Sequence, residues 1–156
     1  MDWNALSALS SLRAAIGVNV TVDYLAVQVR QNTLETRAAS FNAITDSFNA
    51  INLDIARDKE LASLCLRGMA DLEQLDDTEA VQFGMLVLSM FRVHESVYFQ
   101  SKRGTMEADL YEAEHRSLQF ILAAPGARAW WRHNPLSFTR EFRQHIDTLI
   151  DNSEAG

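Results

Sequence analysis

Apolar residues recur every seven positions through the N-terminal part of the chain, and this spacing constrains the fold more than any other feature. The recurrence is made by Val27, Leu34, Phe41, Phe48 and Ile55, with Ile44 and Ile51 beside them. Seven residues are close to two turns of an α-helix, so the pattern predicts one long helix over 24–57 with a continuous apolar stripe. The opposite side is polar. We interpret it as a solvated face, with a polar groove as the alternative.

The composition agrees with an all-helical chain. The 156 residues are enough for one domain with an apolar core, and six Gly and two Pro are fewer than an all-β chain needs for its turns. The net charge of −7 disfavours generic binding of DNA or RNA, whose phosphates repel an acidic chain. The single Cys65 cannot form an intramolecular disulfide, which fits a reducing compartment.

An apolar segment, residues 5–29, precedes and overlaps the predicted long helix. It is long enough to cross a bilayer at about 20 residues per span. Arg13, Asn19 and Asp23 interrupt it, however, and each charge at mid-membrane costs on the order of 2.5–3.5 kcal/mol. The segment is also too long, and too poor in flanking basic residues, for a cleavable signal peptide. We expect a helix buried against protein, or a poor membrane span with paired charges.

The same segment alternates like a strand from Val18 to Tyr24, which competes with the helical interpretation. No other strand signal is present to supply a partner, so we predict a helix that continues from 5–29 into 24–57. Such a helix would carry an apolar strip that needs a cover, made by Leu6, Leu9, Leu12, Ile16 and Val20. A second copy, another protein or lipid could cover it. In an antiparallel dimer, Arg13 and Asp23 could pair across the seam.

Cap and turn residues divide the rest of the chain into shorter helices. Asp76 and Glu79 have the spacing of a capping box, which also explains these acids without a metal. With Gly104 as a turn, and Thr105 as a cap for the next helix, residues 78–102 and 106–123 are predicted to form an antiparallel hairpin, about 78–123. Further helices are expected at about 59–67, between the cap Asp58 and Gly68, at 126–134, between Pro125 and Pro135, and at about 139–151.

Three titratable residues lie within the apolar stretch 84–100: Arg92, His94 and Glu95. At about 100° per residue they do not converge. His94 falls on the apolar face, Glu95 on its flank, and Arg92 nearly opposite. A buried histidine needs a partner, and an antiparallel hairpin places Glu114 level with His94. We favour a structural pair that sets helix register. The alternative is the start of a general base or of a metal site.

The evidence for catalysis is weak. Glu112 and His115 have the Glu-x-x-His spacing of di-iron bundles, but Glu112 points away from the apolar face and the chain has no second copy of the motif. No nucleophile motif, phosphate-binding glycine loop or Cys/His metal cluster is present. We therefore expect no metal, cofactor or catalytic residue, although an enzyme is not excluded. The candidate binding residues are His94, Glu95 and Glu114, together with Arg30, Gln31 and Asn32, which could pair with Glu95.

Arginines and tryptophans gather near the C-terminus, where Arg128 and Arg132 flank Trp130 and Trp131. Both residue types favour membrane interfaces and protein interfaces. These four residues are the candidate interface. The alternative is ordinary helix charge with a buried tryptophan.

Several stretches together resemble an uncharacterised family of small bacterial proteins. In that family a hydrophobic N-terminal helix runs into an (Ile/Val)-Arg-Gln-Asn-Thr motif, which here is "VRQNT", Val29 to Thr33. The resemblance continues through "INLDIARDKELASLCLRGMAD", "FRVHESVYFQ", "GARAWW" and "FTREFRQHID". It implies a membrane-anchored, all-helical protein and brings no activity. This chain departs from the pattern at Arg13, Asn19 and Asp23, inside the segment expected to span.

The sequence thus predicts an all-α helical bundle in two parts. Residues 1–29 form an apolar helix that serves as an anchor or an oligomerisation segment, and residues 30–152 form a helical domain. The favoured function is a non-catalytic interaction or accessory protein associated with a membrane or a membrane complex, in the cytoplasm or on the cytoplasmic face of the inner membrane. The alternatives are a soluble homo-oligomer, or a small ligand-binding or enzymatic bundle that uses His94, Glu95 and Glu114. The expected partner is a second copy or a membrane protein, and not a nucleic acid.

Overall fold

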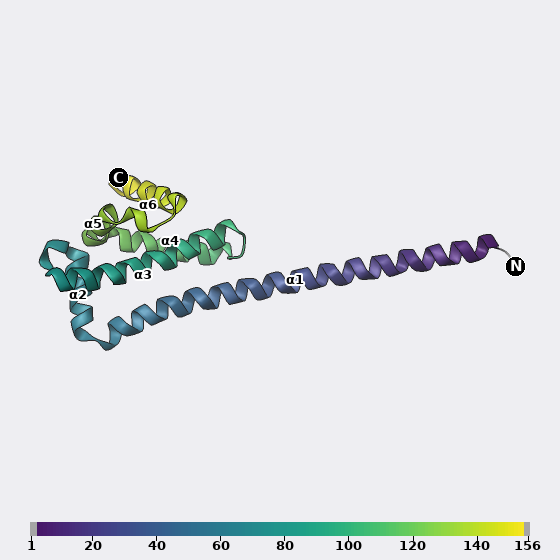
Figure 1. Ribbon diagram of the computed structural model, residues 1–156, viewed down its shortest axis with the longest axis horizontal. Coiled ribbons are helices and arrows are strands. Elements are labelled where there is room, and N and C mark those ends of the chain that lie inside the picture. Colours follow the sequence, from purple (N-terminus) through teal and green to yellow (C-terminus); the bar gives the residue numbers. More distant parts are fainter. Residues whose placement is uncertain (1–2, 155–156) are drawn as a thin grey trace. The chain divides into compact units, whose positions relative to one another are not determined.

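The computed structural model describes the backbone of residues 3–154 and the side chains of residues 21–134 and 136–153. Within these limits it is all-helical and has no strand, which confirms the predicted fold class. Figure 1 shows the helices in chain order. Their bounds are α1 Trp3–Arg57, α2 Lys59–Ala70, α3 Asp77–Lys102, α4 Ala108–Ala123, α5 Pro125–His133 and α6 Arg140–Glu154, with the short 3-10 helices η1 Leu72–Gln74 and η2 Pro135–Ser137.

Helix α1 is a single helix of 55 residues, so the prediction that 5–29 continues as helix into 24–57 is confirmed. The chain packs as two units, residues 1–39 and residues 40–156, and α1 belongs to both. In the first unit, every described side chain from residue 21 to residue 36 is exposed. The apolar strip expected at Leu6, Leu9, Leu12, Ile16 and Val20, like Arg13 and Asn19, lies outside the described side chains.

The continuous buried stripe predicted for α1 is only partly present. Val27, Leu34 and Phe41 are exposed, and burial begins at Ile44. The reason is packing rather than helix geometry, because a seven-residue repeat fixes which residues share a face but not what covers it. In the unit of residues 40–156, Ile44 forms a small apolar cluster with Val97 of α3 and with Met106, Phe48, Val93, Leu110 and Tyr111.

The main core lies in the same unit, where α3 packs against α2, α4, α5 and α6. Phe83, Val87 and Phe91, spaced four residues apart, lie on one face of α3 and are almost completely buried. Three aromatic rings from later elements surround Phe91: those of Trp130, Trp131 and Phe138. The remaining core residues are Leu64, Leu118, Leu122, Phe142, Ile146 and Ile150.

The sequence pattern predicts that the apolar face of this helix consists of Phe83, Leu86, Val87, Met90, Val93 and Val97, and the buried face of α3 is rotated from that one. Phe91 is fully buried, whereas Leu86, Met90 and Val93 are only half-buried. The aromatic rings explain this rotation. Trp130 and Trp131 have a large apolar area, and packing against it buries the side of the helix that carries Phe91. It also brings Glu95 from the flank to a buried position.

Helices α3 and α4 run in opposite directions on either side of a short turn (Figure 1), as predicted for residues 78–123. The capping box is present: Glu79 N–H donates to Asp76, and Asp76 N–H donates to the Glu79 carboxylate. Gly104 makes the turn with a φ of 69°, a conformation that glycine adopts without strain. Thr105 does not cap α4, because its hydroxyl donates to the Gln100 carbonyl oxygen instead.

The other predicted helix ends are close to those observed. Asp58 caps α2 as expected and accepts hydrogen bonds from two backbone N–H groups. Gly68 does not end this helix, which continues to Ala70. Its lack of a side chain is used for packing, since an added Cβ would lie 2.5 Å from the ring of Phe83.

Candidate functional site

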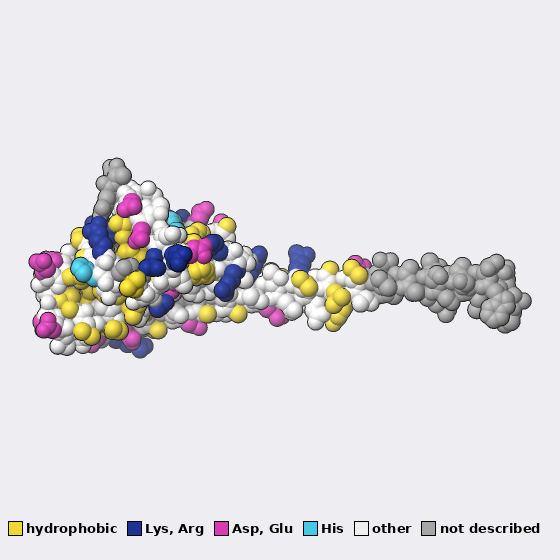
Figure 2. Space-filling model, turned by 45° about the horizontal axis from the view of Figure 1, so that its top comes forward, with side chains coloured by type: hydrophobic (Ala, Val, Ile, Leu, Met, Phe, Trp, Pro, Cys, Tyr) yellow, Lys and Arg dark blue, Asp and Glu magenta, His cyan; other side chains and the backbone are white. Residues whose placement is uncertain are grey.

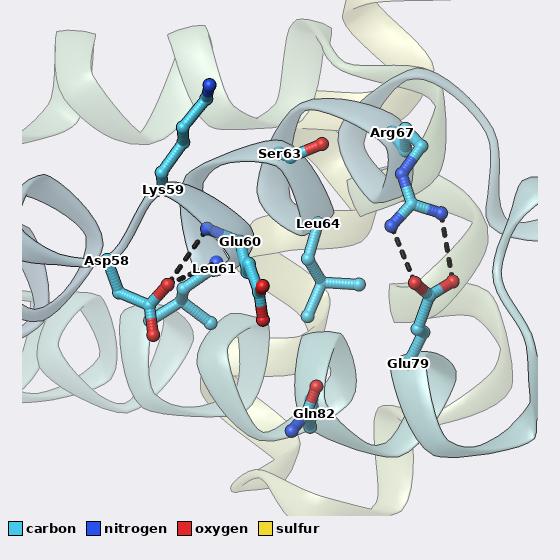
Figure 3. Close-up of a pocket in the computed structure, with 9 residues that line it drawn as sticks. All are labelled: Asp58, Lys59, Glu60, Leu61, Ser63, Leu64, Arg67, Glu79 and Gln82. Carbon is cyan, nitrogen blue, oxygen red and sulfur yellow. Dashed lines mark hydrogen bonds and ion pairs between the residues drawn. The ribbon is translucent and has the colours of Figure 1, made fainter.

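A polar groove lies between α2 and α3 in the unit of residues 40–156 (Figure 3). Its volume is about 570 Å³, and its lining residues are Asp58, Lys59, Glu60, Leu61, Ser63, Leu64, Arg67, Glu79 and Gln82. Figure 3 shows the Asp58 cap at one end and a bidentate ion pair between Arg67 and Glu79 at the other. The guanidinium donates to the two carboxylate oxygens over 2.9 and 2.6 Å.

Three charged groups of this groove, those of Asp58, Arg67 and Glu79, are already used by the fold. The hydrogen bond to Arg67 lowers the pKa of Glu79, and the same bond raises the pKa of Arg67. Glu79 also completes the capping box, and Asp58 is occupied by backbone N–H groups. The groove therefore holds α2 against the start of α3.

Glu95 is the more informative carboxylate, because it is buried and links two helices that are distant in sequence. One of its oxygens accepts a hydrogen bond of 2.9 Å from the backbone N–H of Thr139, one residue before α6. The other accepts a hydrogen bond of 2.8 Å from Arg92. A carboxylate at the N-terminus of a helix satisfies a free N–H group and interacts favourably with the helix dipole.

The structure places Arg92 at an exposed position, as expected, and corrects the expectation for the partners of Glu95. Arg92 pairs with Glu95, and its guanidinium carbon lies 4.9 Å from the centre of the Phe138 ring. Glu95 was expected to pair with the "RQN" stretch. Both of its oxygens instead have partners from α3 and from the start of α6, while Arg30, Gln31 and Asn32 are exposed.

We expect the Glu95→Gln variant to lose about 1.5–3 kcal/mol of unfolding free energy, the usual worth of a hydrogen bond to a charged group. The amide removes the charge that holds Arg92 and the Thr139 N–H. Urea unfolding measures the loss. The matched control is Glu112→Gln on α4, whose loose ion pair with Arg116 is exposed, so less than about 0.5 kcal/mol is expected. Equal losses in the two variants would contradict an anchoring role for Glu95.

His94 is buried, as predicted, with 2% of its surface exposed. The expected pair with Glu114 is not formed. Within the described part of the chain, the Nε2 atom of His94 has no hydrogen-bond partner, and its ring contacts Phe48 of α1 edge-on at 5.1 Å between centres. Burial lowers the pKa of His94 to about 4, with a further contribution from His115.

His115 of α4, one residue beyond the predicted partner, is the residue that contributes to the lowered pKa of His94. Adjacent helical residues point about 100° apart, so the rotation of α4 about its axis decides which of the two side chains faces α3. Glu114 lies instead along a second groove of about 370 Å³, together with Phe48, Ile51, Asn52, Met90, Ser117 and Ile121. Burial raises the pKa of this carboxyl group.

His115 also joins a third histidine. Its ring centre lies 5.7 Å from that of His145 on α6 and 5.8 Å from that of Tyr111. His145 in turn lies 4.8 Å from the ring centre of Tyr98 on α3. Burial lowers the pKa of His145, with a further contribution from His115. Three histidines from three helices therefore form one cluster, which we call the histidine cluster: His94, His115 and His145.

The three histidines share no motif or helical spacing, so the sequence alone does not reveal this cluster. Only the packing of α3, α4 and α6 brings them together. Among the residues whose placement the structure describes, no group of three or more His, Cys, Asp or Glu side chains is arranged to hold a metal ion.

The candidate interface at the C-terminus is mostly core. Trp130 and Trp131 are buried, and the indole N–H of Trp131 donates to Asp147 over 2.9 Å. Arg128 donates to the carbonyl oxygens of Leu122 and Ala123, at the end of α4. Only Arg132 keeps an exposed position. The tryptophans thus follow the alternative interpretation, burial in the core.

A scan against protein-family models and searches of curated proteins and of solved structures found no match. The fold and its side chains are therefore the basis for a functional proposal.

Proposed function

We propose that the protein is a non-catalytic helical interaction protein, an accessory component of a membrane or a membrane complex, and that the first part of α1 is its docking arm. The supporting observation is a run of large apolar side chains that are at least half-exposed: Val22, Tyr24, Leu25, Val27, Val29 and Leu34. Figure 2 shows several of them as apolar side chains along the part of α1 next to the grey residues. Exposed apolar patches of this kind mark interaction sites.

The chemistry of the other candidate sites agrees with a role without catalysis. Glu95 anchors α6, Glu79 pairs with Arg67, and His94 and Glu114 are not joined. A ligand-binding or enzymatic bundle that uses His94, Glu95 and Glu114 thus lacks a convergent set of polar groups. We do not propose it further.

The membrane part of the proposal rests on the resemblance to a membrane-anchored family. No helix within the described residues is long and apolar enough to cross a membrane. We propose attachment through a protein partner or at the lipid surface, on the cytoplasmic face of the inner membrane. The alternative is a soluble homo-oligomer, which is favoured by the seven-residue spacing of Val27, Leu34 and Phe41, all exposed, since this spacing suits a helix seam.

Sedimentation of the purified chain without detergent, together with flotation on phospholipid vesicles, tests both proposals. We expect either flotation with vesicles or self-association, because the apolar run needs a cover. Leu34→Glu should abolish whichever is seen by placing a charge on the run. Gln28→Glu, which adds the same charge at an exposed polar position of α1, should behave like the wild type.

The outcomes separate the two candidates. Flotation without self-association supports membrane attachment, and a detergent-independent oligomer supports the alternative. A compact monomer that neither floats nor self-associates would remove both.

A further inference from the structure

The histidine cluster has no part in the proposed function, and its chemistry is unusual for a structural core. Two of its ring nitrogens, Nε2 of His94 and Nδ1 of His115, are buried without a hydrogen-bond partner in the described part of the molecule. A buried polar group without a partner lowers the stability of the fold, and a buried charge lowers it more. The imidazole of His94 is therefore tolerated while neutral and would be strongly disfavoured once protonated.

The acidic groups around the cluster would do little to stabilise a positive charge on it. On α3, the Glu95 carboxylate is already bound to Arg92 and Thr139. On α6, the Glu141 carboxylate pairs with Lys102 of α3 and accepts a long hydrogen bond from Tyr98.

Helix α4 contributes Tyr111, Glu112 and Glu114, and Glu112 faces the exposed Arg116. Glu114 is half-buried, and burial raises the pKa of its carboxyl group. Helix α1 contributes an apolar ring, Phe48, against His94. Protonating His94 would thus place a positive charge in a poorly solvated site.

The segment most affected by this protonation is the last part of α1. Of its apolar residues between 40 and 57, Ile44 is buried, while Phe48, Ile51 and Ile55 are only half-buried. The Phe48 ring rests on the imidazole of His94. Lightly packed elements open with small free energies, below that of global unfolding.

We propose that the histidine cluster is an acid-sensitive latch: neutral His94 holds residues 40–57 of α1 on α3 and α4, and protonation of His94 releases this segment while the core around Phe91 stays folded. His94 carries the contact with α1, and His115 couples it to His145. The release uncovers the apolar surface of Val93 and Val97, which pack with Ile44 and Phe48 in the closed form.

Hydrogen–deuterium exchange, corrected for the intrinsic pH dependence of amide exchange, tests the latch. A base whose pKa is about 4 when packed and 6.5 when free shifts the opening equilibrium about 30-fold between pH 7.5 and pH 5. We therefore expect protection of residues 40–57 to fall by a factor of that order, while protection of α2 changes much less.

One variant and a control sharpen the result. His94→Leu should abolish the pH-dependent fall. His133→Gln, at an exposed histidine of α5, should behave like the wild type. The latch is overturned if all helices lose protection together, if residues 40–57 show no fall, or if His94→Leu shows the same fall as the wild type.

Discussion

Replacing Gly126 by alanine is expected to cost about 3 kcal/mol or more of unfolding free energy, the upper range for overpacking a protein interior. A Cβ atom at this position would overlap the carbonyl oxygen of Gly68 and would lie 2.8 Å from its carbonyl carbon and 3.0 Å from that of Met69. These are backbone atoms of α2, so no side chain can rotate away. The start of α5 and the end of α2 would have to separate.

The consequences extend beyond the contact because α5 carries Trp130 and Trp131 into the core. Displacing the start of α5 shifts rings that stack on Phe91 and Phe138. Tight packing resists such a shift, since interiors are filled nearly as densely as organic crystals. We expect lower urea midpoints and a weakened near-ultraviolet signal of the tryptophans.

Gly104→Ala is the matched control for the Gly126 substitution. It also lies outside the helix interiors, but an added methyl group there would meet no atom within 4 Å. Its cost is the strain of a positive φ, about 1 kcal/mol. A Gly126→Ala variant that loses no more stability than Gly104→Ala would show that the two helices do not approach this closely.

Local features of the fold could be predicted from sequence, and the contacts between distant residues could not. The cap at Asp58, the capping box of Asp76 and Glu79, and the turn at Gly104 each depend on residues within a few positions. The contact between Gly68 and Gly126 joins residues far apart in the chain, and neither glycine has a sequence signature that names its partner.

In the candidate site, too, local features could be predicted from sequence and contacts between distant residues could not. Burial of His94 follows from the apolar face of its own helix, so sequence predicted it. The predicted pair with Glu114 is not formed, because pairing depends on the rotation of α4 about its axis, which the sequence does not reveal. The sequence predicted a flank position for Glu95. The residues next to it in the sequence do not reveal that the backbone N–H of Thr139, at the start of α6, needs a hydrogen-bond acceptor.

Acid should destabilise the protein through His94, and this is the second large effect that we expect. Burial lowers the pKa of His94 from its ordinary value of 6.5 to about 4, so the unfolded chain binds this proton more tightly than the folded one does. The contribution to unfolding free energy is complete above pH 6.5, falls as the pH drops from 6.5 to 4, and changes no further below that. The loss between pH 7.5 and pH 5 is about 2 kcal/mol.

Urea unfolding at a series of pH values measures this slope, and the His94→Leu variant assigns it. Leucine is close to histidine in size and cannot be protonated. The variant should be at least as stable as the wild type at pH 7.5, because the Nε2 atom that it removes has no hydrogen bond to lose within the described residues. It should also lose most of the acid slope, and the remainder belongs to His145, whose pKa is lowered by burial as well. A His94→Leu variant with an unchanged slope would place the acid sensitivity elsewhere, whereas a variant that is flat from pH 7.5 to pH 5 would trace it to this single buried base.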